Sequence, residues 1–241
     1  MKPPASNPII FALDVGTWDD ARRLVEELKA WVWGFKIGKE LFTAMGPGVV
    51  EMIRDQEARV FLDLKYHDIP ATVAKASAMA TKLGVAMFTI HTLGGREMMR
   101  VAVEASWEAA QRENVERPSI LGVTVLTSLR QTDLTEIGLT RSVEEEVVHL
   151  ATMAQASGLD GVVASPKEIR SLRAACGERL VIVTPGVRPK QSRQHDQARV
   201  MTPKEAIQAG ADFLVIGRPI REAANPQVAA KEILAEVTGS I

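Results

Sequence analysis

A cluster of charged residues follows directly after a run of apolar ones near residue 60. Val60-Phe61-Leu62 is typical of a buried strand, and Asp63, Lys65 and Asp68 come immediately after it. Because side chains on a strand alternate between its two faces, we expect Asp63 and Lys65 on the same face. A carboxylate and an ammonium on an interior face are costly to bury unless other groups satisfy them. The segment therefore predicts either a structural ion pair at the end of a strand or a site where both charges act on a ligand.

Two more charged residues, Asp14 and Lys36, stand at the ends of apolar runs. We expect Lys36, Asp63, Lys65 and Asp68 to form one hydrogen-bonded array of alternating sign. Such an array can keep a lysine protonated beside a reacting carbon. The structural alternatives are a simple Lys36–Asp63 pair and an N-cap role for Asp14 in the first helix.

The elements that must position these residues alternate along the whole chain. Short β-rich runs are separated by longer amphipathic ones, which is typical of parallel βαβ units. The predicted strands are Ile9–Asp14, Trp33–Ile37, Val60–Lys65, Met87–His91, Ile120–Leu126, Gly161–Ala164, Leu180–Thr184 and Phe213–Ile216. The predicted helices, the first opened by a capping box at Thr17, cover 21–30, 47–57, 69–83, 96–112, 143–157, 166–175, 203–209 and 219–237.

Eight such units in 241 residues match an α/β protein of the (β/α)8 TIM-barrel class, with residues 1–241 as a single domain. A doubly wound open sheet is the alternative, but no G-x-G-x-x-G pattern follows the first predicted strand. In a barrel, catalytic residues lie at the carboxyl ends of the strands. Those ends carry the charged residues described above.

The loops after the last two predicted strands suggest a phosphate site. Gly186 and Gly217 allow backbone N–H groups to approach an anion closely, and Arg188 and Arg218 add guanidinium donors. Loops after strands 7 and 8 are the usual phosphate site of a barrel. Turn chemistry alone is the alternative interpretation, but the placement favours a small phosphate ester as ligand.

The polar stretch 188–202 lacks apolar periodicity. Its length and its place beside the phosphate site predict a lid that orders over the ligand, with a plain surface loop as the alternative.

Composition excludes several classes of protein. The formal net charge is −1, which does not favour nucleic acid as a partner. A single cysteine, Cys176, excludes an intrachain disulfide and is expected to be a buried small apolar residue. The first residues lack the apolar region of a signal peptide, and no apolar run reaches membrane-spanning length. We therefore expect a cytoplasmic protein without a membrane segment.

Taken together, these motifs resemble the orotidine 5′-phosphate decarboxylase family in its bacterial form, along essentially the full chain. The stretch from Asp63 to Val73 (DLKYHDIPATV) is the most specific part of the resemblance. The supporting segments occur in the family's order: 11–14 (FALD), 35–38 (FKIG), 123–128 (VTVLTS), 184–188 (TPGVR) and 216–220 (IGRPI).

The resemblance implies decarboxylation of orotidine 5′-monophosphate to UMP in pyrimidine biosynthesis, without metal or organic cofactor. It implies that Lys65 donates a proton to C6 of the pyrimidine and that Asp63 lies against the departing carboxylate. Lys36 would anchor the charged network and the ribose, and Asp14 would bind ribose hydroxyls.

The same resemblance implies a homodimer with shared active sites. Asp68 and Thr72 match the pair that the family sends across the interface into the neighbouring site. Thr127 and Ser128 match the segment that contacts the pyrimidine edge. The residues on the phosphate side would be Arg188, Gln197, Gly217 and Arg218, and the match is loosest between residues 189 and 199, where Lys190 replaces a frequent amide.

Three other functions are alternatives. A 3-keto-L-gulonate 6-phosphate decarboxylase or a hexulose-phosphate synthase would share the D-x-K-x-x-D strand but use Mg²⁺ with a glutamate at the position of Lys36. A metal site built from Asp63, His67, Asp68 and His91 lacks suitable ligand spacing. A barrel that only binds a phosphate ester would not require Lys36, Asp63 and Lys65 together.

Overall fold

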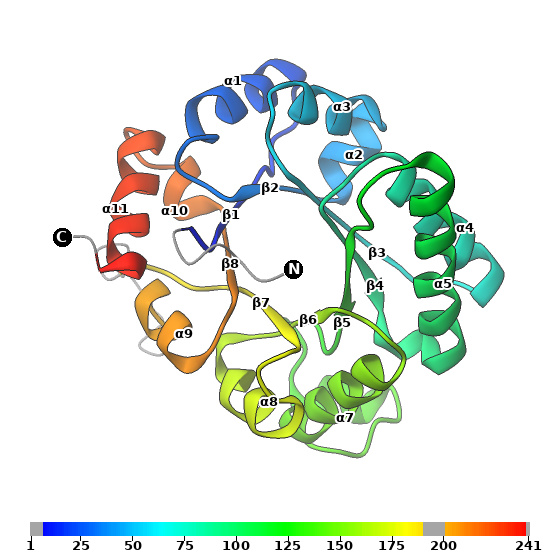
Figure 1. Ribbon diagram of the computed structural model, residues 1–241. Helices are drawn as coiled ribbons and strands as arrows, with labels where there is room; N and C mark the ends of the chain where they lie inside the picture. The colour runs from blue at the N-terminus through cyan, green and yellow to red at the C-terminus, as the bar shows by residue number, and fades with distance from the viewer. Residues whose placement is uncertain (1–6, 190–200, 240–241) are drawn as a thin grey trace.

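Eight parallel strands form a closed barrel in the computed structural model, which describes residues 7–189 and 201–239. The strands follow one another around the barrel in chain order, and β1 closes it by pairing with β8 (Figure 1). Their bounds are β1 Ile9–Ala12, β2 Gly34–Ile37, β3 Val60–Tyr66, β4 Met87–His91, β5 Ser119–Val123, β6 Gly161–Val163, β7 Val181–Pro185 and β8 Phe213–Ile216. The predicted (β/α)8 barrel is therefore confirmed.

Helices surround the barrel, and most of them follow a strand and return the chain to the opposite end (Figure 1). Their bounds are α1 Trp18–Leu28, α2 Lys39–Met45, α3 Gly48–Asp55, α4 Pro70–Lys82, α5 Gly95–Glu113, α6 Gln131–Glu136, α7 Val143–Ala156, α8 Ile169–Cys176, α9 Pro203–Ala209, α10 Arg218–Arg221 and α11 Pro226–Thr238. Short 3-10 turns, η1 Thr92–Gly94 and η2 Pro166–Glu168, precede α5 and α8. Thr17 caps α1 as predicted, with its side chain accepting a hydrogen bond from the backbone N–H of Asp20.

The strand side chains divide the apolar core into two parts. Ile9 and Phe11 point outward and pack under the helices, whereas Ile10 and Ala12 belong to a second cluster that fills the barrel interior. On β2, Phe35 and Ile37 pack in the outer cluster. The alternation of side chains along a strand therefore turns Lys36 toward the barrel interior.

Apart from shifts of up to three residues at element ends, the predicted elements differ from the structure in three places. Helices α2 and α6 were not predicted, because each spans at most seven residues and shows little apolar periodicity. The segment 219–237, predicted as one helix, is broken into α10 and α11. The break occurs because Pro226 occupies the first turn of α11, where Asn225 caps the helix through the N–H of Val228.

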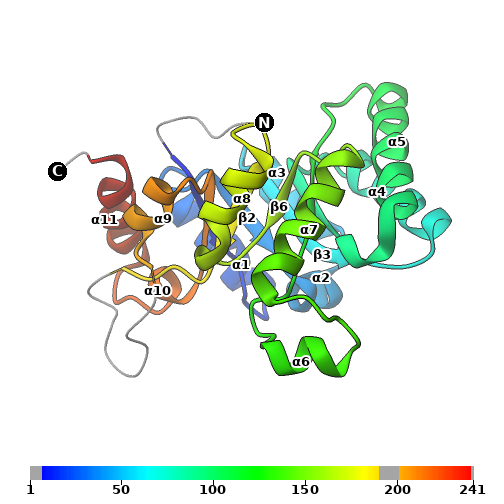
Figure 2. The same cartoon turned by 90° about the horizontal axis from the view of Figure 1, so that it is seen from below.

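The view in Figure 2 shows α6 projecting beyond one end of the barrel, on the side where the chain leaves β5. This is the carboxyl end of the strands. The predicted lid, 188–202, falls almost entirely on residues outside those that the structure describes. Cys176 is buried at the end of α8, as expected. None of the helices in the described ranges combines the length and apolarity needed to span a bilayer.

Candidate active site

Four charged groups form a continuous array at the carboxyl ends of β1, β2 and β3. Lys36 Nζ donates to Asp14 Oδ1 at 3.0 Å and lies 3.9 Å from Asp63 Oδ2. Lys65 Nζ donates to the same Asp63 oxygen at 2.7 Å. The side chains of Lys36 and Asp63 are 13% and 14% exposed, so the centre of the array is largely shielded from water. Alternating charges in such surroundings hold one another in place.

The strand that carries Asp63 and Lys65 is irregular at this point. Leu62 pairs with Phe88, but the next pair is Tyr66 with Ile90, so β3 contains extra residues relative to β4. Lys65 absorbs the irregularity with a left-handed backbone, φ 55°. The two side chains meet on one face, as predicted, although the strand reaches this arrangement through a bulge.

Thr89 on β4 completes the array and was not predicted from the sequence. Its side-chain oxygen accepts the backbone N–H of Lys65 at 2.9 Å, and its hydroxyl donates to Asp63 Oδ1 at 3.0 Å. The signal was available in the alternation of β4, since Met87 faces the interior and Thr89 therefore faces it too.

Within its own chain, Asp68 makes no contact with the other charged groups of the array. Its carboxylate accepts the backbone N–H of Ile69 at 2.6 Å, and no described cation lies within ion-pairing distance of it. Asp14 is the fourth charged group of the array within one chain. Asp14 is not the N-cap of α1, because Thr17 has that role, and the Asp14 backbone carbonyl accepts a hydrogen bond from Arg221.

A cavity of about 1190 Å³ opens beside the array at the carboxyl end of the barrel. Asp14 and Lys36 line one side of it, and Asp63 connects Lys36 to Lys65 next to this wall. The rest of the wall comes from the loops after β5, β6, β7 and β8, and the loop after β8 lies directly beside β1 and Asp14. This part of the wall includes all the described residues that were predicted for the pyrimidine edge and the phosphate: Thr127, Ser128, Arg188, Gly217 and Arg218.

The glycines of the predicted phosphate loops fit their positions. Gly186 has φ 82°, which L side chains rarely adopt, and a Cβ on Gly217 would lie 3.2 Å from Cβ of Ala12. Among the described residues, no carboxylate lies within ion-pairing distance of Arg188 or Arg218. The backbone N–H of Arg188 donates to the carbonyl of Met201, whereas Gln197 lies outside the described residues.

The loop after β6 adds a further part of the wall. Ser165 and Glu168 both line the cavity and form a capping box around η2, with the Ser165 N–H donating to the Glu168 carboxylate at 2.8 Å. Burial raises the pKa of Glu168. The Ser-Pro-x-Glu pattern could have identified this capping box.

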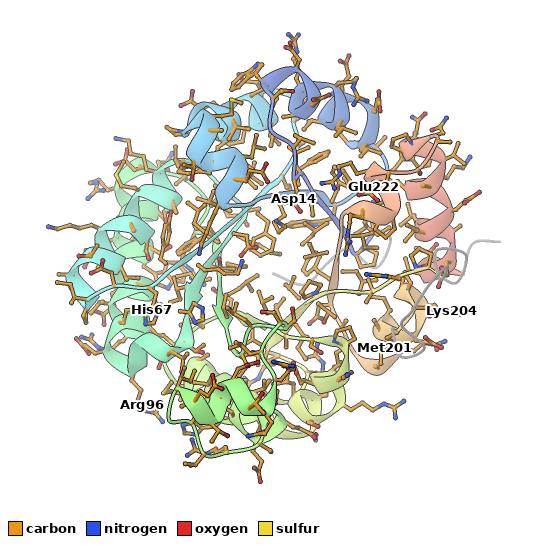
Figure 3. The ribbon with its side chains drawn as sticks, turned by 180° about the vertical axis from the view of Figure 1, so that it is seen from behind. Asp14, His67, Arg96, Met201, Lys204 and Glu222 are labelled. Atoms are coloured by element: carbon orange, nitrogen blue, oxygen red, sulfur yellow. The ribbon has the colours of Figure 1, made fainter. Side chains whose placement is uncertain are left out.

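Two histidines lie on the other side of the array, stacked with ring centroids 5.2 Å apart. His91 ends β4, and its Nδ1 is buried without a hydrogen-bond partner in the described structure. Burial, together with the positive charges of His67, Lys39 and Lys65, lowers the pKa of His91 to about 4. Figure 3 shows His67 well separated from Asp14, which lies close to Glu222 near the inner edge of the ring. Within the ranges described, His, Cys, Asp and Glu form no group of three or more that could hold a metal ion.

The residues predicted to cross a dimer interface lie on the surface. Asp68 and Thr72 are both exposed. Two large apolar side chains of the same region are also exposed, with Ile69 at 67% and Leu93 at 42%. Within one chain, neither Asp68 nor Thr72 lines the cavity.

The chain is a closed (β/α)8 barrel with a charged array and a cavity at the carboxyl ends of its strands. Barrel enzymes have their active sites at this end, so the chain has the architecture of a barrel enzyme. Residues 7–233 match the model of the Orotidine 5′-phosphate decarboxylase / HUMPS family. The chain therefore belongs to this family.

Individual relatives agree with this assignment. The chain is 53% identical to orotidine 5′-phosphate decarboxylase of Trichlorobacter lovleyi, over 98% of each chain. It is 52% identical to the protein of the same name from Syntrophotalea carbinolica, over 98% of this chain and 97% of the relative. The crystal structure of orotidine 5′-phosphate decarboxylase from Lactobacillus acidophilus superposes with a TM-score of 0.85 at 35% identity, covering 96% of this chain and 99% of that one. The chain is accordingly an enzyme of the carboxy-lyase class.

Proposed function

We propose that this protein decarboxylates orotidine 5′-monophosphate to UMP in pyrimidine biosynthesis, without a metal or organic cofactor. The observation that carries the proposal is the array Asp14–Lys36–Asp63–Lys65 beside a cavity that is also lined by two arginines without carboxylate partners among the described residues. A nucleotide that spans such a cavity would have its phosphate at the arginines and its ring at the array. The names of the relatives agree with this substrate.

The chemistry requires a positive charge beside C6. When the bond between C6 and the carboxylate breaks, CO₂ leaves and the electron pair remains on C6, in the plane of the ring. An ammonium fixed near that carbon stabilises the carbanion more than it stabilises the substrate, which is the condition for catalysis. Lys65 then transfers its proton to C6 and gives UMP.

The other array members hold Lys65 and contact the substrate. Asp63 keeps the Lys65 ammonium in place from 2.7 Å, and its carboxylate would lie against the departing group. Lys36, bound to Asp14 at 3.0 Å, would reach the ribose together with Asp14.

The loops after β5, β7 and β8 would bind the rest of the nucleotide. Thr127 and Ser128 are exposed to the cavity from the loop after β5 and would contact the edge of the pyrimidine. The phosphate dianion would lie against Gly217, Arg218 and Arg188, where charge-assisted hydrogen bonds are strong. The sequence adds Gln197 to this group.

The proposal includes a homodimer in which each site is completed by the neighbouring chain. Asp68 and Thr72 are exposed and outside the cavity of their own chain, next to the exposed Ile69 and Leu93. Apolar side chains at such a position gain stability from burial against a second copy. Asp68 would then extend the array of the neighbouring site.

The HUMPS part of the family description names a second candidate activity on the same fold. Lys36 argues against the Mg²⁺ chemistry of that alternative, because its ammonium occupies the space between Asp14 and Asp63 and would repel a dication. One experiment separates the two. The purified protein is given orotidine 5′-monophosphate with and without excess EDTA, and the loss of substrate absorbance and the release of CO₂ are followed. We expect equal turnover in both arms. Absence of turnover, or turnover that EDTA removes and Mg²⁺ restores, would contradict the proposal.

A further inference from the structure

We infer that Thr89 is a positioning residue, which sets the direction of the Asp63 carboxylate and fixes the backbone of Lys65. This inference rests on the proposed function, because it assigns a role in the same reaction. Thr89 is fully buried on β4, so it acts through its two neighbours and touches no substrate.

One hydroxyl makes both contacts. A threonine side chain has a single proton and two lone pairs. The proton goes to Asp63 Oδ1 at 3.0 Å, and a lone pair accepts the N–H of Lys65 at 2.9 Å. The hydroxyl therefore links the carboxylate and the lysine backbone that together place the Lys65 ammonium.

The contact with Asp63 decides which carboxylate oxygen faces the cations. Oδ1 is held by Thr89, which leaves Oδ2 for Lys65 at 2.7 Å and for Lys36 at 3.9 Å. Without the hydroxyl, the carboxylate could rotate about its terminal bond, a torsion with broad preferences. Both lysines would then lose a fixed partner.

The contact with Lys65 holds an unusual backbone. Among the described residues, three that are not glycine have positive φ: Glu57, Lys65 and Asn114. Glu57 and Asn114 lie just beyond the ends of α3 and α5, where left-handed residues often terminate helices. Lys65 lies within a strand, where this conformation needs support from its surroundings. The stiff, β-branched side chain of Thr89 supplies it.

The test compares Thr89→Val, which keeps the shape and removes the hydroxyl, with Thr89→Ser, which keeps the hydroxyl. A matched control is Thr92→Val, because Thr92 is equally buried and donates to the carbonyl of Val123 at 2.8 Å, outside the array. We expect Thr89→Val to lower kcat by about 10- to 100-fold, the order expected for a displaced catalytic group. UMP affinity should change by less than about threefold, because the phosphate wall is untouched. Thr89→Ser and Thr92→Val should both stay within about threefold of the wild-type kcat.

Several results would overturn the inference. A kcat of Thr89→Val within about threefold of wild type would do so, and so would an equal loss of kcat and UMP affinity, which indicates a collapsed site. If Thr89→Val does not fold, Thr89→Ala is tested in the same way. Failure of both to fold, with Thr92→Val intact, would show that the hydroxyl serves folding alone. If the wild type itself does not convert orotidine 5′-monophosphate, the proposed function fails before any variant is measured, and this inference fails with it.

Discussion

The two sides of the cavity hold their charges in opposite ways. On the side of β1 to β3, two lysines and two aspartates neutralise one another through contacts of 2.7 to 3.9 Å. On the side of β7 and β8, Arg188 and Arg218 have no carboxylate partner among the described residues. The first region has its geometry before any ligand arrives, which is what catalysis by fixed charges requires. The second has positive charge that a ligand must neutralise. We therefore assign the chemistry to the array and the phosphate-binding energy to the two arginines.

Lys65→Ala should show the largest effect. The proton donor is lost while the cavity wall is unchanged, so kcat should fall to undetectable levels in an orotidine 5′-monophosphate assay. Lys29→Ala, an exposed lysine at the end of α1, is the control for loss of one positive charge. If the Lys65→Ala enzyme kept more than about a tenth of the wild-type kcat, the activation barrier would have changed by less than about 1.4 kcal/mol. That result would contradict the catalytic role assigned to the array.

Mixing two inactive variants tests whether the array is completed by a second chain. Homodimers of Lys65→Ala and of Asp68→Ala should each be nearly inactive. After subunit exchange, random pairing makes about half of the dimers mixed, and each mixed dimer has one intact site, so about a quarter of wild-type activity should return.

The control for this experiment mixes Lys65→Ala with Asp63→Ala. Both residues belong to the same site of one chain, so no activity should return. Recovery of activity in this control would rule out the shared site. Absence of recovered activity in the first mixture, once subunit exchange is verified, would also rule it out.

Arg218→Ala should affect binding more than chemistry. A charge-assisted phosphate contact contributes roughly 1.5–3 kcal/mol, so KM should rise by about 10- to 100-fold. Arg170→Ala removes the same charge from an exposed position on α8 and should leave KM unchanged. Equal KM values for Arg218→Ala and Arg170→Ala would show that the substrate phosphate does not bind at Arg218.

The smallest effect concerns His91, which lies beside the array without belonging to it. Its pKa of about 4 in the folded chain lies below the ordinary value of 6.5. Between these two pH values the unfolded chain binds more protons, so the free energy of unfolding must fall as the pH drops from 6.5 to 4. We expect His91 to lower the free energy of unfolding by about 1–2 kcal/mol over this pH range, a figure reduced because the ring is partly exposed.

Urea unfolding of the wild type and of His91→Gln at several pH values measures this contribution. In the variant, the free energy of unfolding should fall less steeply between pH 6.5 and 4 than in the wild type. Identical slopes would show that His91 titrates normally in the folded protein.

The sequence predicted the barrel well because strand and helix periodicity are local properties. Every predicted strand exists, and the predicted pairing of Asp63 with Lys65 on one face is confirmed. The contact between Asp14 and Lys36 could not be predicted, because it depends on how far β1 and β2 extend at the barrel mouth. Thr89 was missed because a threonine in an apolar strand carries no charge signal. The left-handed backbone of Lys65 follows from the register between β3 and β4, which is a tertiary property.

The division between the two regions is tested most directly by the dissociation constant of UMP, measured by calorimetry on Lys65→Ala and Arg218→Ala at equal ionic strength. Lys65→Ala should bind UMP within about threefold of the wild type, because the contact it removes acts on the reacting carbon. Arg218→Ala should bind UMP about 10- to 100-fold more weakly. If Lys65→Ala bound UMP as weakly as Arg218→Ala, Lys65 would contribute to nucleotide binding, and the assignment of chemistry to Lys65 and of phosphate binding to Arg218 would be wrong.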